Sequence, residues 1–366
     1  MESKGRIVIK VGSSSLTSAA GALLQERLIE LAKAIDTLQD EGWEPVLVSS
    51  GAVATGLGEL GWRRENLTMP ERQAAAAVGQ GLLMEKYNQV FEPYDIRVAQ
   101  ILLTRDDLGD RRRYINARNT MNTLLQHGVL PVVNENDTVV FAEIRFGDND
   151  TLSALVAGLV EAKLLVILTD TDGFYSSDPH KDPTARLIPV VEKIGPEMEM
   201  CAGGSSGPVG TGGMRTKLMA ARIAGRSGIR TVLASGDQPA NVVAIARGEQ
   251  IGTTFEPARQ GLRSRKRWIA FSSVPRGTVV VDAGAANALL AGKKSLLAVG
   301  VVDVEGDFAA GSIVRIKEVN GAILGKGIVN LSAEDLRLVL RKPRRGLEVI
   351  NRDWLVCERV MTDVNG

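Results

Sequence analysis

Short apolar runs alternate with amphipathic stretches along the first two-thirds of the chain. The runs are nearly continuous Val, Ile and Leu, which is typical of strands that are covered on both faces. We expect strands at Arg6–Val11, Pro45–Ser49, Arg97–Leu103, Val129–Val133, Leu164–Thr169 and Thr231–Ala234. The intervals hold helical patterns at Gln25–Gln39, Ser153–Val160 and Lys217–Arg226. This alternation predicts an α/β domain over residues 1–258, with a mostly parallel sheet in an αβα sandwich.

The pattern changes after residue 258. Residues 259–274 contain the basic stretch Arg263–Arg267 and are expected to be a linker. From Pro275 the apolar runs are short, and the pair Asn320-Gly321 between two of them indicates a hairpin. The runs expected to be strands are Gly277–Asp282, Val299–Val304, Ser312–Glu318 and Ile323–Asn330, with one short helix at Ala285–Ala291. The sequence therefore predicts a small, mostly β domain over residues 275–353 and a tail over 354–366.

Composition narrows the classes of protein. The 366 residues are 44% hydrophobic and 24% charged, which is typical of a globular protein with two domains. The net charge of +1 provides no overall field for nucleic acid or an anionic membrane. With two Cys and two His, neither a disulfide framework nor a multi-histidine metal site is expected. The first residues lack the apolar core of a secretion signal, and no run approaches the ~20 residues of a membrane span, so we expect a soluble, cytoplasmic protein.

Candidate chemistry lies where the predicted strands end, because ligands of open α/β sheets bind beyond the carboxyl ends of the strands. Lys10 lies near the end of the first strand, and Gly12 follows in a Gly/Ser turn, a combination that can hold phosphoryl oxygens. Ser50 and Gly51 follow the second strand, where free N–H groups at a helix start favour an anion. Each motif alone is equally typical of an ordinary strand–helix turn.

Two clusters of Asn and Asp follow the fourth strand. They are Asn134-Glu135-Asn136-Asp137 and Gly147-Asp148-Asn149-Asp150, the second one directly before a helix. Helix capping explains one of these residues but not both clusters. Carboxylates bind an ammonium group and amides bind either an ammonium or a carboxylate, which suits a zwitterionic amino acid. A cation site is the alternative interpretation, because hard metals also prefer oxygen ligands.

Two further segments suit a nucleotide. Thr169 and Asp170 end a strand, although this signal is weak on its own. Ser205–Lys217 is rich in glycine and opens a helix, so it can present several N–H donors and one lysine to a polyphosphate. It is not a Walker A loop, since Lys217 lacks the flanking Gly and Ser/Thr. Gly56–Gly61 matches G-x-G-x-x-G, but it starts several residues past its strand and is interpreted as a glycine-rich helix end.

Phosphoryl transfer would need little else from such a chain. It requires positive charge around the γ-phosphate, donors on its oxygens, Mg²⁺ and an aligned acceptor. A carboxylate acceptor is already nucleophilic at neutral pH, so the scarcity of histidine fits this chemistry.

Taken in order, the segments closely resemble the glutamate 5-kinases of the amino acid kinase family. The matching segments are IVIKVGSS (7–14), VSSGAVATG (48–56), LPVVNENDTV (130–139), FGDNDTLSALVA (146–157), LLVILTDTDGFY (164–175) and GTGGMRTKLMAARIA (210–224). VDVEGDFAAGSIVRI (302–316) resembles part of a PUA domain. The resemblance implies ATP-dependent phosphorylation of the L-glutamate side-chain carboxylate to L-glutamyl 5-phosphate, with Mg²⁺, as the first step of proline biosynthesis. It also implies feedback inhibition by proline, a homo-oligomer, and functional coupling to glutamyl phosphate reductase.

The resemblance assigns roles to residues as well. Lys10 and Lys217 would stabilise the transferring phosphoryl group, Asp150 would orient both lysines, and Gly12 and Gly51 would supply N–H groups. Glutamate would be bound by Ser50, Asn134, Asp137, Asp148 and Asn149, with Asp137 contacting the ammonium group. ATP would be bound by Lys10, Thr169, Asp170, Thr211, Gly212, Gly213, Met214, Arg215, Thr216 and Lys217.

Two alternatives remain at this point. One is a kinase of the same fold for another acceptor, such as N-acetylglutamate, aspartate or carbamate. An N-acetylated substrate has no ammonium group for the Asn/Asp clusters to bind, which disfavours that acceptor. The other is an RNA-binding or regulatory protein that acts through the PUA domain, where residues 275–353 hold 12 Lys/Arg against 9 Asp/Glu. The basic run Arg341–Arg345 lacks interleaved aromatic residues for base stacking, which disfavours RNA without excluding it.

Overall fold

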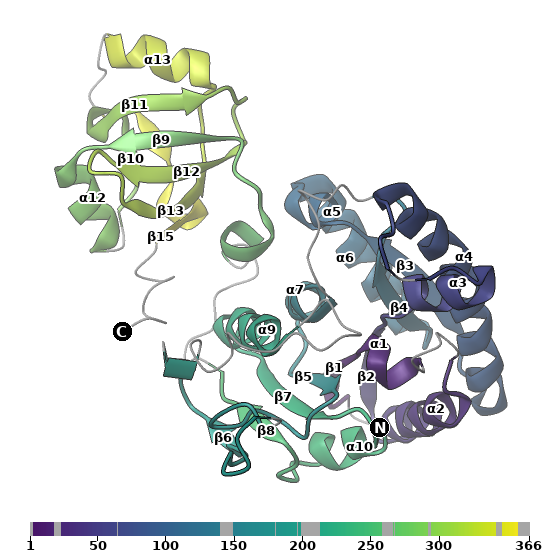
Figure 1. Cartoon of the computed structure of the whole chain (residues 1–366). Coiled ribbons are helices and arrows are strands. Elements are labelled where there is room, and N and C mark those ends of the chain that lie inside the picture. Colours follow the sequence, from purple (N-terminus) through teal and green to yellow (C-terminus); the bar gives the residue numbers. More distant parts are fainter. Residues whose placement is uncertain are drawn as a thin grey trace. The chain divides into compact units, whose positions relative to one another are not determined.

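The computed structural model describes most of the chain (Figure 1). The described residues are 3–17, 23–63, 65–139, 149–179, 181–195, 197–198, 213–257, 266, 268–291, 294–341 and 346–357. The chain divides into two compact units, one formed by Met1–Leu108 with Arg112–Gly261 and the other by Gly109–Arg111 with Leu262–Gly366. Among the described residues, no helix is both long enough and apolar enough to cross a membrane.

The first unit is built on a sheet with the strand order β3-β4-β2-β1-β5-β7-β8-β6. The strands are β1 Gly5–Val11, β2 Trp43–Val48, β3 Val98–Leu103, β4 Leu130–Glu135, β5 Leu164–Thr169, β6 Val190–Val191, β7 Arg230–Ser235 and β8 Thr253–Phe255. All neighbours from β3 to β7 pair in parallel, and β8 is antiparallel to β7. All six predicted strands are present within one or two residues of their predicted ends. The predicted mostly parallel α/β sheet is therefore confirmed.

Helices cover the two faces of this sheet. They are α1 Ser13–Leu16, α2 Gln25–Asp40, α3 Ala52–Leu60, α4 Met69–Phe91, α5 Arg105–Gly109, α6 Arg111–Gln126, α7 Asn149–Leu159, α9 Met214–Arg226 and α10 Asn241–Ala246. Helices α2, α4 and α10 enclose the main core with alternate strand residues such as Ile7, Ile9 and Leu47. Helices α7 and α9 pack together against β1, β5 and β7 on the opposite face (Figure 1).

Helix α4 begins with a capping box. The Thr68 N–H donates to Glu71 Oε2 at 2.8 Å, the Glu71 N–H donates back to Thr68 Oγ1 at 3.4 Å, and a proline lies in the first turn. The helix then crosses α3 so closely that a Cβ on Gly56 would lie 1.8 Å from the Ala75 carbonyl oxygen. A Cβ on Gly79 would likewise lie 1.9 Å from the carbonyl oxygen of Ala52. The G-x-G-x-x-G match is thus part of a helix crossing and helix end, as interpreted from the sequence.

The second unit contains a sheet with the order β11-β9-β12-β13-β15 and a pair, β10-β14. Its elements are β9 Gly277–Val281, α12 Ala283–Leu290, β10 Leu296–Leu297, β11 Val301–Gly306, β12 Ile313–Glu318, β13 Ile323–Ile328, α13 Ala333–Arg341, β14 Glu348–Ile350 and β15 Leu355–Cys357. Strands β12 and β13 form the predicted Asn-Gly hairpin, with Gly321 at φ +93°. The predicted mostly β domain is confirmed.

Part of the expected linker packs on this second sheet. Trp268–Ser272 forms a single π-helical segment that contacts β13 and β15. Lys326 Nζ donates to the Ser273 carbonyl oxygen at 3.1 Å and holds the end of the segment. Residues 268–273 therefore belong to the packed structure of the second unit.

Candidate active site

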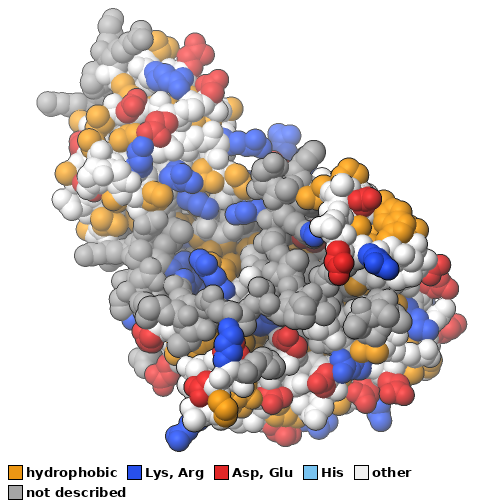
Figure 2. Space-filling model, viewed as in Figure 1, with side chains coloured by type: hydrophobic (Ala, Val, Ile, Leu, Met, Phe, Trp, Pro, Cys, Tyr) orange, Lys and Arg blue, Asp and Glu red, His pale blue; other side chains and the backbone are white. Residues whose placement is uncertain are grey.

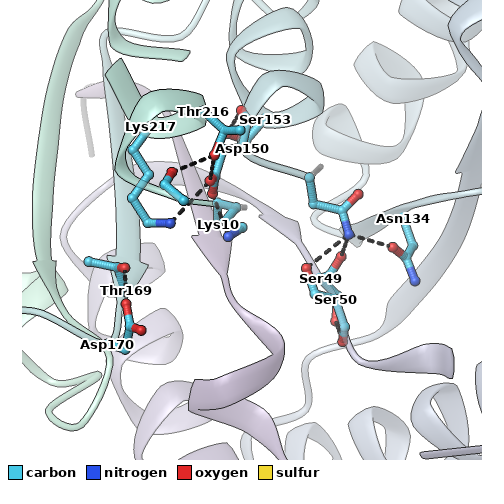
Figure 3. Close-up of polar contacts among 12 residues, drawn as sticks. Lys10, Ser49, Ser50, Asn134, Asp150, Ser153, Thr169, Asp170, Thr216 and Lys217 are labelled. Carbon is cyan, nitrogen blue, oxygen red and sulfur yellow. Dashed lines mark hydrogen bonds and ion pairs between the residues drawn. The ribbon is translucent and has the colours of Figure 1, made fainter. Parts of the chain in front are cut away.

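Three charged side chains from distant parts of the sequence meet above the centre of the first sheet. Ile9 points into the core under α2, so the next residue, Lys10, points to the face covered by α7 and α9. Lys10 Nζ lies 2.5 Å from Asp150 Oδ1, and Lys217 Nζ lies 3.2 Å from Asp150 Oδ2 (Figure 3). The side chains of Lys10, Asp150 and Lys217 are only 8%, 1% and 7% exposed. We call these three residues the lysine–aspartate cluster.

The lysine–aspartate cluster carries a net positive charge. Burial raises the pKa of Asp150, but the charges of Lys10 and Lys217, with hydrogen bonds from Lys10 and Thr216, lower it from 3.8 to about 2. At neutral pH the cluster therefore holds two positive charges and one negative charge. A buried excess charge is costly unless an opposite charge compensates it, so this position favours an anionic ligand.

The start of α9 reinforces this preference for an anion. Gly213 precedes the helix and Met214 begins it. The Thr216 N–H donates to the Gly213 carbonyl oxygen at 3.1 Å, whereas the N–H groups of Met214 and Arg215 come before the first intrahelical hydrogen bonds and point toward an anion site. Thr216 Oγ1 donates to Asp150 Oδ2 at 2.8 Å and links the helix to the lysine–aspartate cluster. Arg215 is exposed. The predicted nucleotide residues Thr211 and Gly212 lie outside the described residues.

The predicted nucleotide residues of β5 lie at the strand next to β1. Thr169 is buried at the end of β5, and its Oγ1 donates to Asp170 Oδ1 at 2.8 Å (Figure 3). Asp170 itself is exposed. Gly12 precedes the short helix α1 and lies close to Lys10. A Cβ at Gly12 would stand 3.6 Å from Lys10 Nζ, so the backbone of this turn runs close to the lysine.

On the other side of β1, the buried amide of Asn134, the half-buried amide of Asn149 and the Ser50 hydroxyl form a second group. Asn149 Nδ2 lies 2.8 Å from the Ser49 carbonyl oxygen, 2.9 Å from Ser50 Oγ and 3.0 Å from Asn134 Oδ1. Its three partners are labelled in Figure 3. We call Ser50, Asn134 and Asn149 the amide cluster. Asn149 Oδ1 is buried and has no hydrogen-bond partner among the described residues.

Gly51, Asp137 and Asp148 are the remaining residues predicted for the glutamate site or for catalysis. Gly51 precedes α3 with φ +99°, a conformation that favours glycine. Asp137 is half-buried in the turn after β4. Asp148 lies outside the described residues.

The sheet arranges these groups in one line. Along β4, β2, β1 and β5 the strand ends carry Asn134, then Ser50, then Lys10, then Thr169. Adjacent strands lie roughly 4.8 Å apart, so the whole line spans about 15 Å. Consecutive residues of α7 join its two halves, because Asn149 contacts the amide cluster and Asp150 contacts the lysines.

Two buried polar residues of α4 support the amide cluster and were not predicted. Asn134 Nδ2 donates to Gln80 Oε1 at 2.9 Å, and the Tyr87 hydroxyl lies 2.8 Å from Ser49 Oγ. Burial raises the pKa of Tyr87, so this phenol stays protonated at physiological pH. The Thr68–Glu71 capping box and the later apolar residues of α4 are the sequence signal that could have revealed this helix.

Charged side chains outside the site are mixed in sign. On the face shown in Figure 2, Lys and Arg are interspersed with Asp and Glu over the described surface. Among the described residues, no group of three or more His, Cys, Asp or Glu could hold a metal ion. The cation-site interpretation of the Asn/Asp clusters therefore has no support in the described part of the chain.

Comparison with known proteins places the chain in a family. The amino acid kinase family model matches residues 5–235 and the PUA domain model matches residues 277–348. Glutamate 5-kinase of Geobacter sulfurreducens is 48% identical over 361 residues, 96% of this chain and 97% of the relative. That of Moorella thermoacetica is 50% identical over 328 residues, 90% of this chain and 87% of the relative. That of Burkholderia lata is 48% identical over 358 residues, 98% of this chain and 96% of the relative.

These relatives are matched over almost their whole length, and their identity is well above the level at which a family is shared. The chain belongs to the amino acid kinase family and, within it, to the glutamate 5-kinases with a PUA domain.

Proposed function

We propose that this chain transfers the γ-phosphoryl group of ATP to the side-chain carboxylate of L-glutamate, giving L-glutamyl 5-phosphate and ADP, the first step of proline biosynthesis. The observation that carries the proposal is the buried net positive charge of the lysine–aspartate cluster directly beside the buried amide cluster. A polyanion suits the lysine–aspartate cluster, and a zwitterion suits the amide cluster. The glutamate 5-kinases at 48–50% identity support the same pair of substrates.

In this proposal the lysines stabilise the phosphoryl group during transfer. Lys10 and Lys217 would contact its oxygens from two sides, and Asp150 would fix both ammonium groups before ATP arrives. The N–H groups at the start of α9 would take part of the remaining phosphate charge, and Thr169 and Asp170 would bind the nucleotide. Gly12 would let its turn approach the reacting centre.

The transfer itself requires no general base. An oxygen of the ionised glutamate carboxylate would attack the γ-phosphorus while the bond to the bridging oxygen breaks, and ADP would leave with the electron pair. No proton is moved in this step. Asp150, whose pKa is lowered to about 2, would remain a carboxylate throughout.

The amide cluster would bind the amino acid end of glutamate. Asn149 Oδ1 is a buried acceptor that the substrate ammonium can satisfy, and Asp137 would provide a second contact for that charge. The Ser50 hydroxyl accepts from Asn149 and so keeps its own O–H for a substrate oxygen. Asn134 would orient Asn149, and the backbone N–H of Gly51 would face the reacting carboxylate.

Mg²⁺ would enter with the nucleotide. The described residues offer no carboxylate cluster for it, and both oxygens of Asp150 are already engaged by lysines. In this proposal Mg²⁺ would be bound by the phosphates of ATP.

Three finer features form part of the same proposal: inhibition by proline, assembly into a homo-oligomer, and functional coupling to glutamyl phosphate reductase. The coupling to the reductase follows from the chemistry of the product. An acyl phosphate is a mixed anhydride, which water hydrolyses unless another enzyme consumes it. The comparisons do not favour the alternative of RNA binding. Residues 342–345 of the basic run lie outside the described residues.

The test is ADP release with Mg-ATP and one acceptor at a time, with hydroxylamine present to trap an acyl phosphate. L-glutamate, N-acetyl-L-glutamate and L-aspartate serve as acceptors. Turnover with trapped hydroxamate is expected for L-glutamate alone. Equal turnover with N-acetyl-L-glutamate would contradict the assignment of the amide cluster to an ammonium group.

A further inference from the structure

Helix α4 presents two buried polar side chains to the carboxyl ends of β2 and β4. Gln80 and Tyr87 are seven residues apart, two helical turns, and therefore share one face of α4. Gln80 is 8% exposed and Tyr87 is fully buried. Gln80 contacts Asn134, and Tyr87 contacts Ser49, whose carbonyl oxygen in turn accepts from Asn149.

Backbone groups that can only donate or only accept a hydrogen bond set the orientation of the side-chain amides in this hydrogen-bond network. The Glu135 N–H, which can only donate, points to Asn134 Oδ1 at 2.9 Å. The Ser49 carbonyl, which can only accept, lies 2.8 Å from Asn149 Nδ2. Asn134 must therefore direct its Nδ2 toward Gln80, and Gln80 must accept this hydrogen bond with its Oε1, which lies 2.9 Å away.

This fixed direction leaves two unpaired atoms. Asn149 Oδ1 is a buried acceptor and Gln80 Nε2 is a buried donor, and neither has a hydrogen-bond partner among the described residues. Buried polar atoms without partners are costly, so a site that keeps two of them is built for a ligand. Of the two, the acceptor Asn149 Oδ1 matches the ammonium group of an α-amino acid.

We propose that Gln80 is a positioning residue of the glutamate site, which acts through Asn134 to hold Asn149 with its carbonyl oxygen available to the substrate ammonium. This inference rests on the proposed function. Without the Gln80 acceptor, Asn134 Nδ2 would be buried and unpaired, and Asn134 would turn to find another partner. Asn149 would then lose one of the three neighbours that hold its amide group.

The test compares kcat/KM for L-glutamate in Gln80→Met, Asn134→Ala and the double variant. Gln80→Met keeps the volume and removes the acceptor, so kcat/KM for glutamate is expected to fall about tenfold, which corresponds to about 1.4 kcal/mol. The KM for ATP is expected to stay within about twofold. In the Asn134→Ala background the same change is expected to have less than a twofold effect, because its route to the site is gone.

Two controls separate positioning from general packing. Gln89→Met alters another glutamine of α4 that is exposed, and it is expected to leave both substrates unaffected. Gln80→Glu assayed at pH 6 restores an acceptor of the same length, because burial favours the neutral acid, and is expected to recover activity to within about threefold. This variant also decides the question if Gln80→Met does not fold.

Three results would overturn the inference. They are additive losses of kcat/KM for L-glutamate in the double variant, a loss of kcat/KM for ATP as large as that for L-glutamate, or a tenfold loss of kcat/KM for L-glutamate in Gln80→Glu. Turnover of L-glutamate by the unaltered chain is measured first. Its absence would sink the proposed function itself, whereas normal turnover with an unaffected Gln80→Met variant would sink only the role of Gln80.

Discussion

Replacing Asp150 by Asn tests the electrostatics of the site most directly, because the change keeps shape and removes only charge. Asn has one acceptor oxygen, so one of the two lysines would lose its partner and face an amide N–H₂ group. Both ammonium groups are more than nine-tenths buried and would then repel each other without compensation.

Two estimates bound the loss of unfolding free energy that Asp150→Asn is expected to cause. The lowering of the Asp150 pKa from 3.8 to about 2 corresponds to about 2 kcal/mol of stability at neutral pH. Breaking a buried ion pair costs about 3–5 kcal/mol, because it also strands the partner charge. The first figure counts only the ionisation of Asp150, so the second is the better guide, and we expect a loss of about 3–5 kcal/mol.

The assay is urea unfolding of both proteins, with and without ADP. The nucleotide phosphates can replace the lost carboxylate as a counter-charge, so ADP is expected to stabilise Asp150→Asn more than the unaltered chain. The unfolding transition that shifts with ADP belongs to the first unit. Glu30→Gln removes an exposed charge from α2 and serves as control, with an expected change below about 0.5 kcal/mol. A variant as stable as the unaltered chain, with no extra response to ADP, would refute the idea that the three charges are coupled.

Lys217→Ala is expected to lower kcat at least about a hundredfold while far-ultraviolet circular dichroism stays unchanged; near-normal kcat would remove Lys217 from phosphoryl transfer. Gly79→Ala is expected to cost several kcal/mol in unfolding free energy, because the new Cβ would lie 1.9 Å from the Ala52 carbonyl oxygen. Gly81→Ala on the same helix meets open space and should be neutral or stabilising, so equal melting temperatures would contradict the close helix crossing. Since the pKa of Asp150 is lowered, its stabilising contribution is complete above about pH 4 and is lost as the pH falls toward 2. A profile of kcat from pH 5 to 8 should therefore show no titration of Asp150, and an inflection removed by Asp150→Asn would count against the assigned charge state.

The strands could be predicted because their signal is local. Leu164–Thr169 is a continuous apolar run and forms β5 with the predicted ends. Helix α4 could not be predicted from apolar periodicity, since its buried face begins with Ala75, Ala76, Gly79 and Gln80 instead of Leu or Ile. Gly79 is required by the close crossing with α3. The packing that places α4 beside α3 therefore also removes part of the apolar signal by which the helix could be predicted.

The site was only partly accessible from sequence. Lys217 and Asp150 are 67 residues apart, and no spacing rule brings them together. The order of the motifs and their resemblance to a family suggested the grouping, and the structure brings Lys10, Asp150 and Lys217 into contact. The direction of hydrogen bonding through Gln80 depends on backbone groups of two different strands, which sequence patterns do not encode.

Asn149 and Asp150 are neighbours on α7, so the binding of the acceptor amino acid and the transfer of the phosphoryl group depend on the same helix end. Redesign of the acceptor pocket through α7 would disturb the machinery that handles ATP. Helix α4 lies on the opposite face of the sheet and reaches the amide cluster through Asn134 at the end of β4, without contact to either lysine among the interactions described. An engineer who wishes to retarget this fold to another amino acid should therefore begin with α4 and leave α7 alone.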